Sequence, residues 1–135
     1  EAPVPEDLAA AATHVAFSAQ GLADFTGTRD LDAGLAEAVH RTGAWVCVTD
    51  GPSGTLIAGA NGPERIPAPQ VAAIDTLGAG DVWHGAFALS LAEGRSEREA
   101  VVFANATASL KCTRPGGRQG APTRAEVEEF MQGAD

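Results

Sequence analysis

The chain has 135 residues, of which 44% are hydrophobic and 20% are charged, and its formal net charge is −9 at pH 7. This composition is enough for one hydrophobic core of ordinary size, and the negative charge argues against nucleic acid as a partner, because lysine and arginine provide most contacts to a phosphate backbone. No stretch approaches the roughly 18 consecutive apolar residues of a membrane span, and no charged-then-apolar start indicates a signal peptide, so we expect a cytoplasmic protein without a membrane partner.

The first part of the chain predicts alternating strands and helices. Its proline-interrupted, alanine-rich start predicts a linker that leads into a short helix over Glu6 to Ala12, and His14 to Ser18 is typical of a short buried strand. Apolar residues at helical spacing from Leu31 onward predict a helix that stops at Gly43. The apolar run Ala44 to Thr49 is too short for a helix and is typical of a strand buried on both faces of a parallel sheet. This alternation indicates an α/β layered architecture.

Two further short strands are predicted before the middle of the chain. They cover Thr55 to Ala60 and Glu64 to Ala68, and the Asn61-Gly62 pair between them predicts a hairpin turn. The next segment, Val71 to Ile74, is predicted to lead to Asp75 as a strand or as an extended stretch.

Two capping boxes predict the helices of the last part. Ser96 and Glu99 begin a helix that continues to Cys112, with small apolar residues on one face. Thr123 and Glu126 have the same spacing and begin the terminal helix.

A glycine-rich stretch, Asp75-Thr76-Leu77-Gly78-Ala79-Gly80-Asp81, joins a turn to a long apolar helix predicted over Val82 to Leu91. The amides at a helix start have no partner within the helix and carry about half a positive charge between them, so a phosphate is stabilised there without a lysine. Asp81 stands in the first turn, where it is positioned to take a proton. The stretch is neither a Walker loop, since Gly-Lys is missing, nor a dinucleotide fingerprint, since Trp83 replaces the third glycine. The alternative is a loop that only connects two elements.

The same stretch, followed by Val-Trp-His-Gly-Ala-Phe, resembles the C-terminal signature of the PfkB or ribokinase-like carbohydrate kinases. The resemblance implies a ribokinase-like layered α/β/α sheet and ATP-dependent transfer of a phosphoryl group to a hydroxyl of a small sugar. By position, the amides of Gly78, Ala79 and Gly80 form the anion hole for the transferred phosphate, together with Mg²⁺. Asp81 is then the base that deprotonates the sugar hydroxyl.

The resemblance also implies a nucleotide site for ATP. The segment Thr49-Asp50-Gly51-Pro52-Ser53-Gly54 is similar to the family's Thr-x-Gly-x-x-Gly nucleotide loop and follows the carboxyl end of a strand, where ligands bind on open α/β sheets. Ordinary turn chemistry is the alternative. Asn105, a polar amide in a helix of small residues, is either a solvated position or a wall of the adenine pocket. The nucleotide residues are therefore predicted to be Thr49, Asp50, Gly51, Ser53, Gly54 and Asn105.

Thr113 to Gly117 is similar to the family segment that surrounds a monovalent cation with main-chain carbonyls. Gly120 stands where some members have a serine hydroxyl, so one ligand is missing and K⁺ is an optional cofactor. The predicted ligands are the carboxylate of Asp75 and the carbonyls of Leu77, Lys111, Arg114 and Gly116.

Another departure concerns Mg²⁺. Ser18 and Gly21 stand where many members of the family carry the asparagine and glutamate of an Asn-x-x-Glu motif, so the loop after the first strand lacks those groups for the magnesium shell.

Taken together, residues 1–135 are predicted to be the C-terminal, nucleotide-binding part of a single ribokinase-like domain, with the N-terminal substrate and lid portion absent. Its partners are then that missing half and a sugar, with a homodimer left open, and the piece alone should not phosphorylate sugar. Two alternatives remain: a nucleotide-binding or regulatory module of the same fold without catalysis, and a kinase for a nucleoside.

Overall fold

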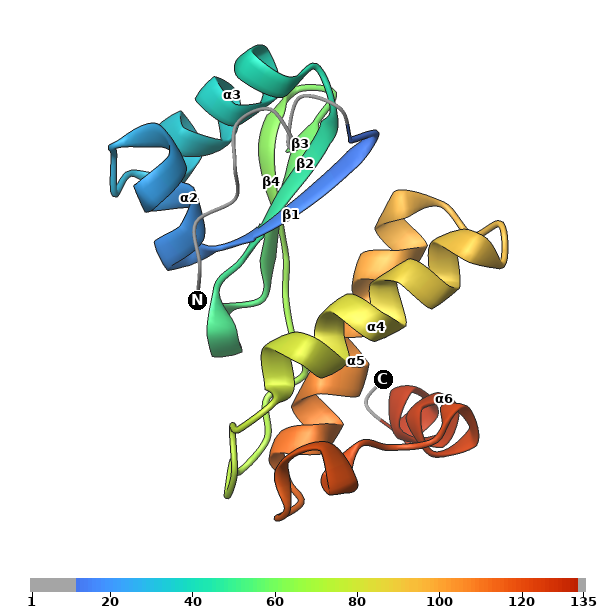
Figure 1. Ribbon diagram of the computed structural model, residues 1–135. Coiled ribbons are helices and arrows are strands. Elements are labelled where there is room, and N and C mark those ends of the chain that lie inside the picture. Colours follow the sequence, from blue (N-terminus) through green and yellow to red (C-terminus); the bar gives the residue numbers. More distant parts are fainter. Residues whose placement is uncertain (1–11, 134–135) are drawn as a thin grey trace. The chain divides into compact units, whose positions relative to one another are not determined.

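The computed structural model describes residues 12–133, which divide after Ile66 into two compact units (Figure 1). The helix expected over Glu6 to Ala12 lies outside the described residues apart from Ala12 itself. Strands and two helices make up the first unit, and three helices make up the second. No helix in the described part of the chain is long and apolar enough to cross a membrane.

The first unit is built on a four-stranded sheet in the order β1-β2-β3-β4. β1 and β2 are parallel, with Ser18 opposite Thr49, whereas β3 is antiparallel to both of its neighbours. The prediction that β2 lies in a parallel sheet is therefore correct for its pairing with β1 and wrong for its pairing with β3. Residues 50–54, which connect β2 to β3, are too few for the crossover that a parallel pair needs. The strands are β1 (His14–Ser18), β2 (Trp45–Thr49), β3 (Thr55–Gly59) and β4 (Gly62–Ile66).

The predicted hairpin between β3 and β4 is confirmed, but its turn lies one residue earlier than expected. Gly59 pairs with Gly62, so the two connecting residues are Ala60 and Asn61. A turn centred on Asn61-Gly62 would place asparagine in the left-handed region. Instead, every described residue other than glycine has a negative φ, and Gly62 takes a φ of 110° at the start of β4.

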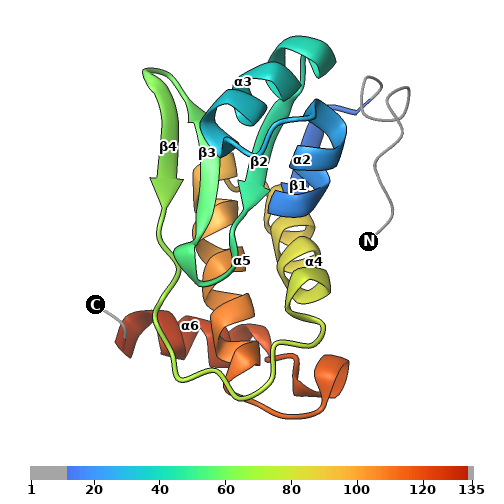
Figure 2. The ribbon, with the colours of Figure 1, turned by 90° about the vertical axis from the view of Figure 1, so that its left-hand side faces the viewer.

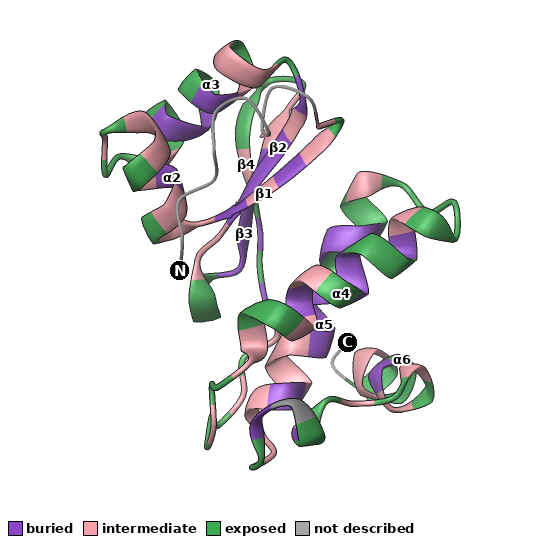
Figure 3. Cartoon of the chain, viewed as in Figure 1, coloured by how far each residue is buried: buried purple, intermediate pink, exposed green. Residues whose placement is uncertain are grey.

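Two helices, α2 (Ala19–Thr26) and α3 (Leu31–Thr42), cover one face of this sheet (Figure 2). The α2 helix corrects the reading of this segment as a loop. Asp30 caps α3 by accepting from the amides of Asp32 and Ala33, and Gly43 ends the helix with a φ of 66°, as predicted. The core of the unit is the apolar layer between helices and sheet, shown in purple in Figure 3. It consists of Val15, Phe17, Leu22, Leu35, Ala38, Ala44, Val46, Val48 and Leu56.

The second unit pairs α4 (Ala79–Ala92) with α5 (Glu97–Cys112), and α6 (Arg124–Gly133) packs against α5 (Figure 1). The capping box at the start of α5 is confirmed, since the Glu99 amide donates to Ser96 Oγ at 3.1 Å and the Ser96 amide donates to Glu99 Oε1 at 3.1 Å. Thr123 and Glu126 make the same reciprocal pair ahead of α6. A short turn of 3₁₀ helix, η2 (Gly117–Gly120), lies between α5 and α6. Residues 71–74 are not a strand.

Candidate functional site

The glycine-rich turn places a helix start without a side-chain cap at the predicted phosphate site. Helix α4 begins at Ala79, earlier than the predicted Val82, and its N-cap is Gly78 with a φ of 81°. No side chain caps this end, whereas α2, α3 and α5 each begin at a capping hydroxyl or carboxylate. The Ala79 amide donates to the Thr76 carbonyl at 3.1 Å, so the turn is partly closed on itself. The Gly80 amide, one residue further on, is one of the first-turn donors that the helix itself does not use.

The surroundings of that amide are open. A Cβ placed on Gly80 would meet no atom within 4 Å, so the protein itself does not require glycine there. Asp81 is exposed in the same turn of α4. His84 lies one turn further along, and its Nδ1 is 2.7 Å from the Gly80 carbonyl oxygen. The arrangement brings a donor, an exposed carboxylate and space together at one helix end.

Asp75 connects this turn to the C-terminal end of α5. Its Oδ1 accepts from the Leu77 amide at 2.9 Å, and its Oδ2 accepts from the amides of Gly116 at 3.1 Å and Gly117 at 3.4 Å. The main chain adds a further link, since the amide of Asp75 donates to the Cys112 carbonyl at 3.1 Å. The hydrogen bond from Leu77 is the largest of several effects that lower the pKa of the Asp75 carboxyl.

Lys111 brings a positive charge to the same place. Its side chain is fully buried, and its Nζ donates to the Asp75 main-chain oxygen at 3.0 Å and lies 3.8 Å from Asp75 Oδ1. The sequence reading had assigned only the Lys111 carbonyl and had missed the side chain. The available signal was a lysine in the last turn of a helix whose other buried residues are mostly small or apolar.

The structure therefore brings together most residues predicted to hold K⁺, but the buried ammonium group of Lys111 lies beside the Asp75 carboxylate, where its charge disfavours a second cation. The Lys111 carbonyl already accepts from the Arg114 amide at 3.0 Å, and the Gly116 carbonyl accepts from the Gln119 amide at 3.0 Å. The Asp75 carboxylate receives three main-chain amides beside a buried ammonium group. The Lys111 ammonium group is thus the cation that lies at the Asp75 carboxylate.

Asn105 is buried, so the reading of this residue as a solvated position is wrong. Its Oδ1 accepts from Trp83 Nε1 at 2.8 Å, which joins α5 to α4, and its Nδ2 donates to the Pro67 carbonyl at 3.4 Å. Trp83 in turn stacks on Phe87, with ring centroids 5.0 Å apart. The amide side chain thus has a structural role within the second unit.

The predicted nucleotide loop lies in the first unit, at the carboxyl end of β2. A turn of 3₁₀ helix, η1 (Gly51–Ser53), closes the loop, and the amide of Asp50 donates to the carbonyl of Gly54 at 2.8 Å. Gly51 and Gly54 have φ values of 55° and 92°, which other residues rarely adopt. Arg65 of β4, which the sequence reading did not single out, donates to Asp50 Oδ2 at 3.2 Å.

Ser18, which occupies the position of the family's asparagine, caps α2. Its hydroxyl accepts from the Gly21 amide at 2.9 Å, and a Cβ on Gly21 would lie 3.0 Å from that oxygen. These two residues form a helix cap in place of a polar pair. Among the described residues, no three histidine, cysteine, aspartate or glutamate side chains group as they would around a metal ion.

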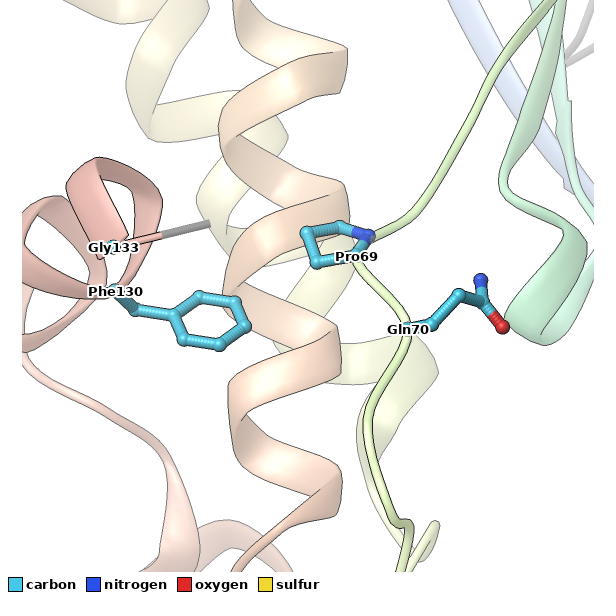
Figure 4. A pocket seen from close by; sticks show the side chains of 4 residues that line it. All are labelled: Pro69, Gln70, Phe130 and Gly133. Carbon is cyan, nitrogen blue, oxygen red and sulfur yellow. The ribbon is translucent and has the colours of Figure 1, made fainter. Parts of the chain in front are cut away.

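A separate cavity of about 440 Å³ lies in the second unit (Figure 4). Pro69, Gln70, Phe130 and Gly133 line it, and the Phe130 ring points toward Pro69. None of the predicted site residues lines this cavity, and no charged side chain from residues 12–133 lines it.

The chain thus combines a mixed sheet, a loop with two glycines after β2, and a helix start that carries an exposed aspartate in its first turn. Residues 2–124 match the pfkB family carbohydrate kinases. The chain belongs to this family.

Relatives and solved structures agree with this assignment. The ribokinase of Bacillus subtilis is 39% identical over 97 residues, which cover 72% of this chain and 33% of that protein. The structure of Arabidopsis thaliana ribokinase with ribose and ATP matches with a TM-score of 0.84 and 28% identity, over 97% of this chain and 44% of that one. A double-mutant fructokinase from Vibrio cholerae, bound to fructose, ADP and potassium ion, matches with a TM-score of 0.79 and 30% identity, over 90% of this chain and 41% of that one. The chain thus spans less than half of the kinases that it matches.

Proposed function

We propose that this chain is the nucleotide-binding part of an ATP-dependent sugar kinase, and that the start of α4 is its phosphoryl-transfer site. The observation that carries the proposal is the conjunction at this helix start: a glycine N-cap, an approachable Gly80 amide and an exposed Asp81 in the first turn. Family membership supports the proposal, as do the sugar and nucleotide in the similar kinases.

The reaction uses these groups in order. Asp81 accepts the proton of a sugar hydroxyl, and the oxygen attacks the terminal phosphorus of MgATP as the bond to the bridging oxygen breaks and releases ADP. The amides of Gly78 and Gly80 face the charge on the transferring phosphoryl group, joined by that of Ala79 once it leaves the Thr76 carbonyl, and the positive end of α4 stabilises that charge. Mg²⁺ enters with the nucleotide as part of the substrate.

The remaining groups bind the nucleotide and the sugar. Thr49, Asp50, Gly51, Ser53 and Gly54 form the proposed nucleotide loop, supported by its place at the carboxyl end of β2. Asn105 is proposed to border the adenine site while its side chain holds Trp83. Apart from Asp81, the residues that contact the sugar are proposed to lie in the part of the similar kinases that this chain does not span.

A second candidate is a member of the fold that binds nucleotide without catalysis. The Ser18 cap favours it, because the Ser18 hydroxyl is used by the Gly21 amide and the resemblance implies polar magnesium-shell residues at these two positions. The exposed Asp81 favours the kinase, since a base has no use in a regulatory site.

The test is Asp81→Asn in the complete polypeptide that carries this chain, assayed for ADP formation with ribose, fructose and a nucleoside. Loss of a positioned base costs on the order of a hundredfold to ten-thousandfold in rate, so turnover should fall by that factor while ATP affinity stays the same.

The matched control is Asp32→Asn, which removes another exposed aspartate from the first turn of a helix, α3. It should leave turnover unchanged. If Asp81→Asn turns over within a few fold of the wild type, Asp81 is not the base. If the wild-type polypeptide binds ATP but phosphorylates none of the three substrates, the regulatory module is favoured.

A further inference from the structure

The only lysine of the chain is Lys111, since the other basic side chains counted with it are arginines. It is also the one charged side chain among the buried residues that the structure describes, with an exposed fraction of 0%. A buried charge is costly unless it is paired and hydrogen-bonded. The position of Lys111 therefore has to be explained by its partners.

Those partners belong to one residue. Lys111 Nζ donates to the main-chain oxygen of Asp75 at 3.0 Å and lies 3.8 Å from the carboxylate Oδ1. A monovalent cation bound at this place would need the same two kinds of group, a carboxylate and main-chain carbonyls. The ammonium group has the same charge as such an ion, and it is tethered to the end of α5.

The turn that contains Gly120 is also closely packed. A Cβ on Gly120 would lie 2.9 Å from the Pro115 carbonyl oxygen and 3.3 Å from Arg114 Cβ, so a serine would not fit there without a shift of the main chain. The position that some relatives use for a hydroxyl ligand is thus filled by the turn itself. This observation is independent of the lysine, and it also disfavours a bound ion.

We propose that the Lys111 ammonium group takes the place of a bound K⁺ and positions the phosphate site through Asp75. Asp75 holds the Leu77 amide, and the turn that contains Leu77 leads directly into the start of α4. Lys111 is therefore a positioning residue that makes this member of the family independent of monovalent cations. The rates predicted below rest on the proposed function, whereas the predicted melting temperatures do not.

The experiment compares wild type, Lys111→Met and Lys111→Arg in potassium chloride and in tetramethylammonium chloride at equal ionic strength. Initial rates are measured on the complete polypeptide, and melting temperatures on both that polypeptide and this chain. Wild type should give equal rates and equal Tm values in the two salts, and Lys111→Arg should do the same because it keeps the charge.

Lys111→Met should lose roughly a hundredfold in rate in tetramethylammonium, the effect expected when reacting groups shift by about 1 Å. Its rate and its Tm should recover as potassium or ammonium chloride is added, because an ion that binds only the folded state raises the melting temperature. A purely structural lysine would give a loss that no cation repairs, and this result would overturn the proposal.

If Lys111→Met does not fold in any salt, the rate and the Tm of the wild type in the two salts test the proposal instead. A wild-type rate or Tm that potassium raises severalfold or by several degrees would overturn the proposal, and equal values support it. A complete polypeptide that phosphorylates no sugar would overturn the proposed function, while the melting curves would still test Lys111.

Discussion

The hydrogen bond between Trp83 and Asn105 is predicted to be a main link between α4 and α5. Both side chains are buried, and the distance from Trp83 Nε1 to Asn105 Oδ1 is 2.8 Å. Asn105→Leu keeps the approximate volume but leaves the indole N–H without this acceptor. A buried donor that loses its partner costs about 1–3 kcal/mol. For a folding unit of roughly 60–100 residues, each kcal/mol lowers Tm by about 4–8 °C.

The assay is urea unfolding followed by far-UV circular dichroism for Asn105→Leu, Trp83→Phe and the double variant. The double variant should be less destabilised than the sum of the singles by about 1 kcal/mol, because the second substitution removes a group that has already lost its partner. Asn61→Leu, which changes an exposed asparagine, is the matched control and should stay within about 0.5 kcal/mol of wild type.

Additive single effects, within about 0.3 kcal/mol, would refute the coupling between the two helices. The same variants also separate the two roles of Asn105. If the residue acts only through Trp83, both single variants should change the KM for ATP equally. A larger increase for Asn105→Leu would support its place beside the adenine.

Two more outcomes are expected. Gly80→Ala should raise the free energy of unfolding by about 0.5–1 kcal/mol, since the position is helical and has space for a methyl group. The same methyl group should weaken MgATP binding, because it blocks the approach to the Gly80 amide. A variant with unchanged stability and unchanged KM for ATP would contradict the phosphate site. Hydrogen bonds with Arg114 first and then with Thr123 lower the pKa of Glu126 to about 2. The stability from these contacts is therefore complete above the ordinary value of 4.5 and is lost as the pH falls toward 2. Chemical denaturation between these pH values should show a steeper loss for wild type than for Glu126→Gln, and parallel profiles would exclude the pair.

Features that depend on a few neighbouring residues could be predicted from the sequence. Asp30 and Gly43 bound α3, and Ser96 with Glu99 begins α5, because capping joins a side chain to main-chain groups within one turn. The glycine-rich turn belongs to the same class, since the glycine spacing and the helix that follows are local. Its carboxylates and glycines predict a phosphate site from the sequence alone.

Features that depend on pairing across the chain were decided by the tertiary structure. The direction of β3 beside β2 is one, since a buried apolar strand has the same composition in parallel and antiparallel pairs. The burial of Asn105 is another, since its partner Trp83 lies 22 residues earlier. Both depend on which surfaces meet, and a short sequence window does not contain that information.

Lys111 shows the same division at the candidate site. From the sequence, it was a lysine near a helix end, where a side chain usually reaches solvent, and only its carbonyl was assigned a role. The fold brings it to Asp75, 36 residues earlier, and buries it completely. The sequence alone determined the glycine-rich turn and the helix that follows it, because both depend on local main-chain geometry. Only the packing of α5 against the turn before α4 decided that the Lys111 ammonium group lies beside Asp75, because the two residues are far apart in the sequence.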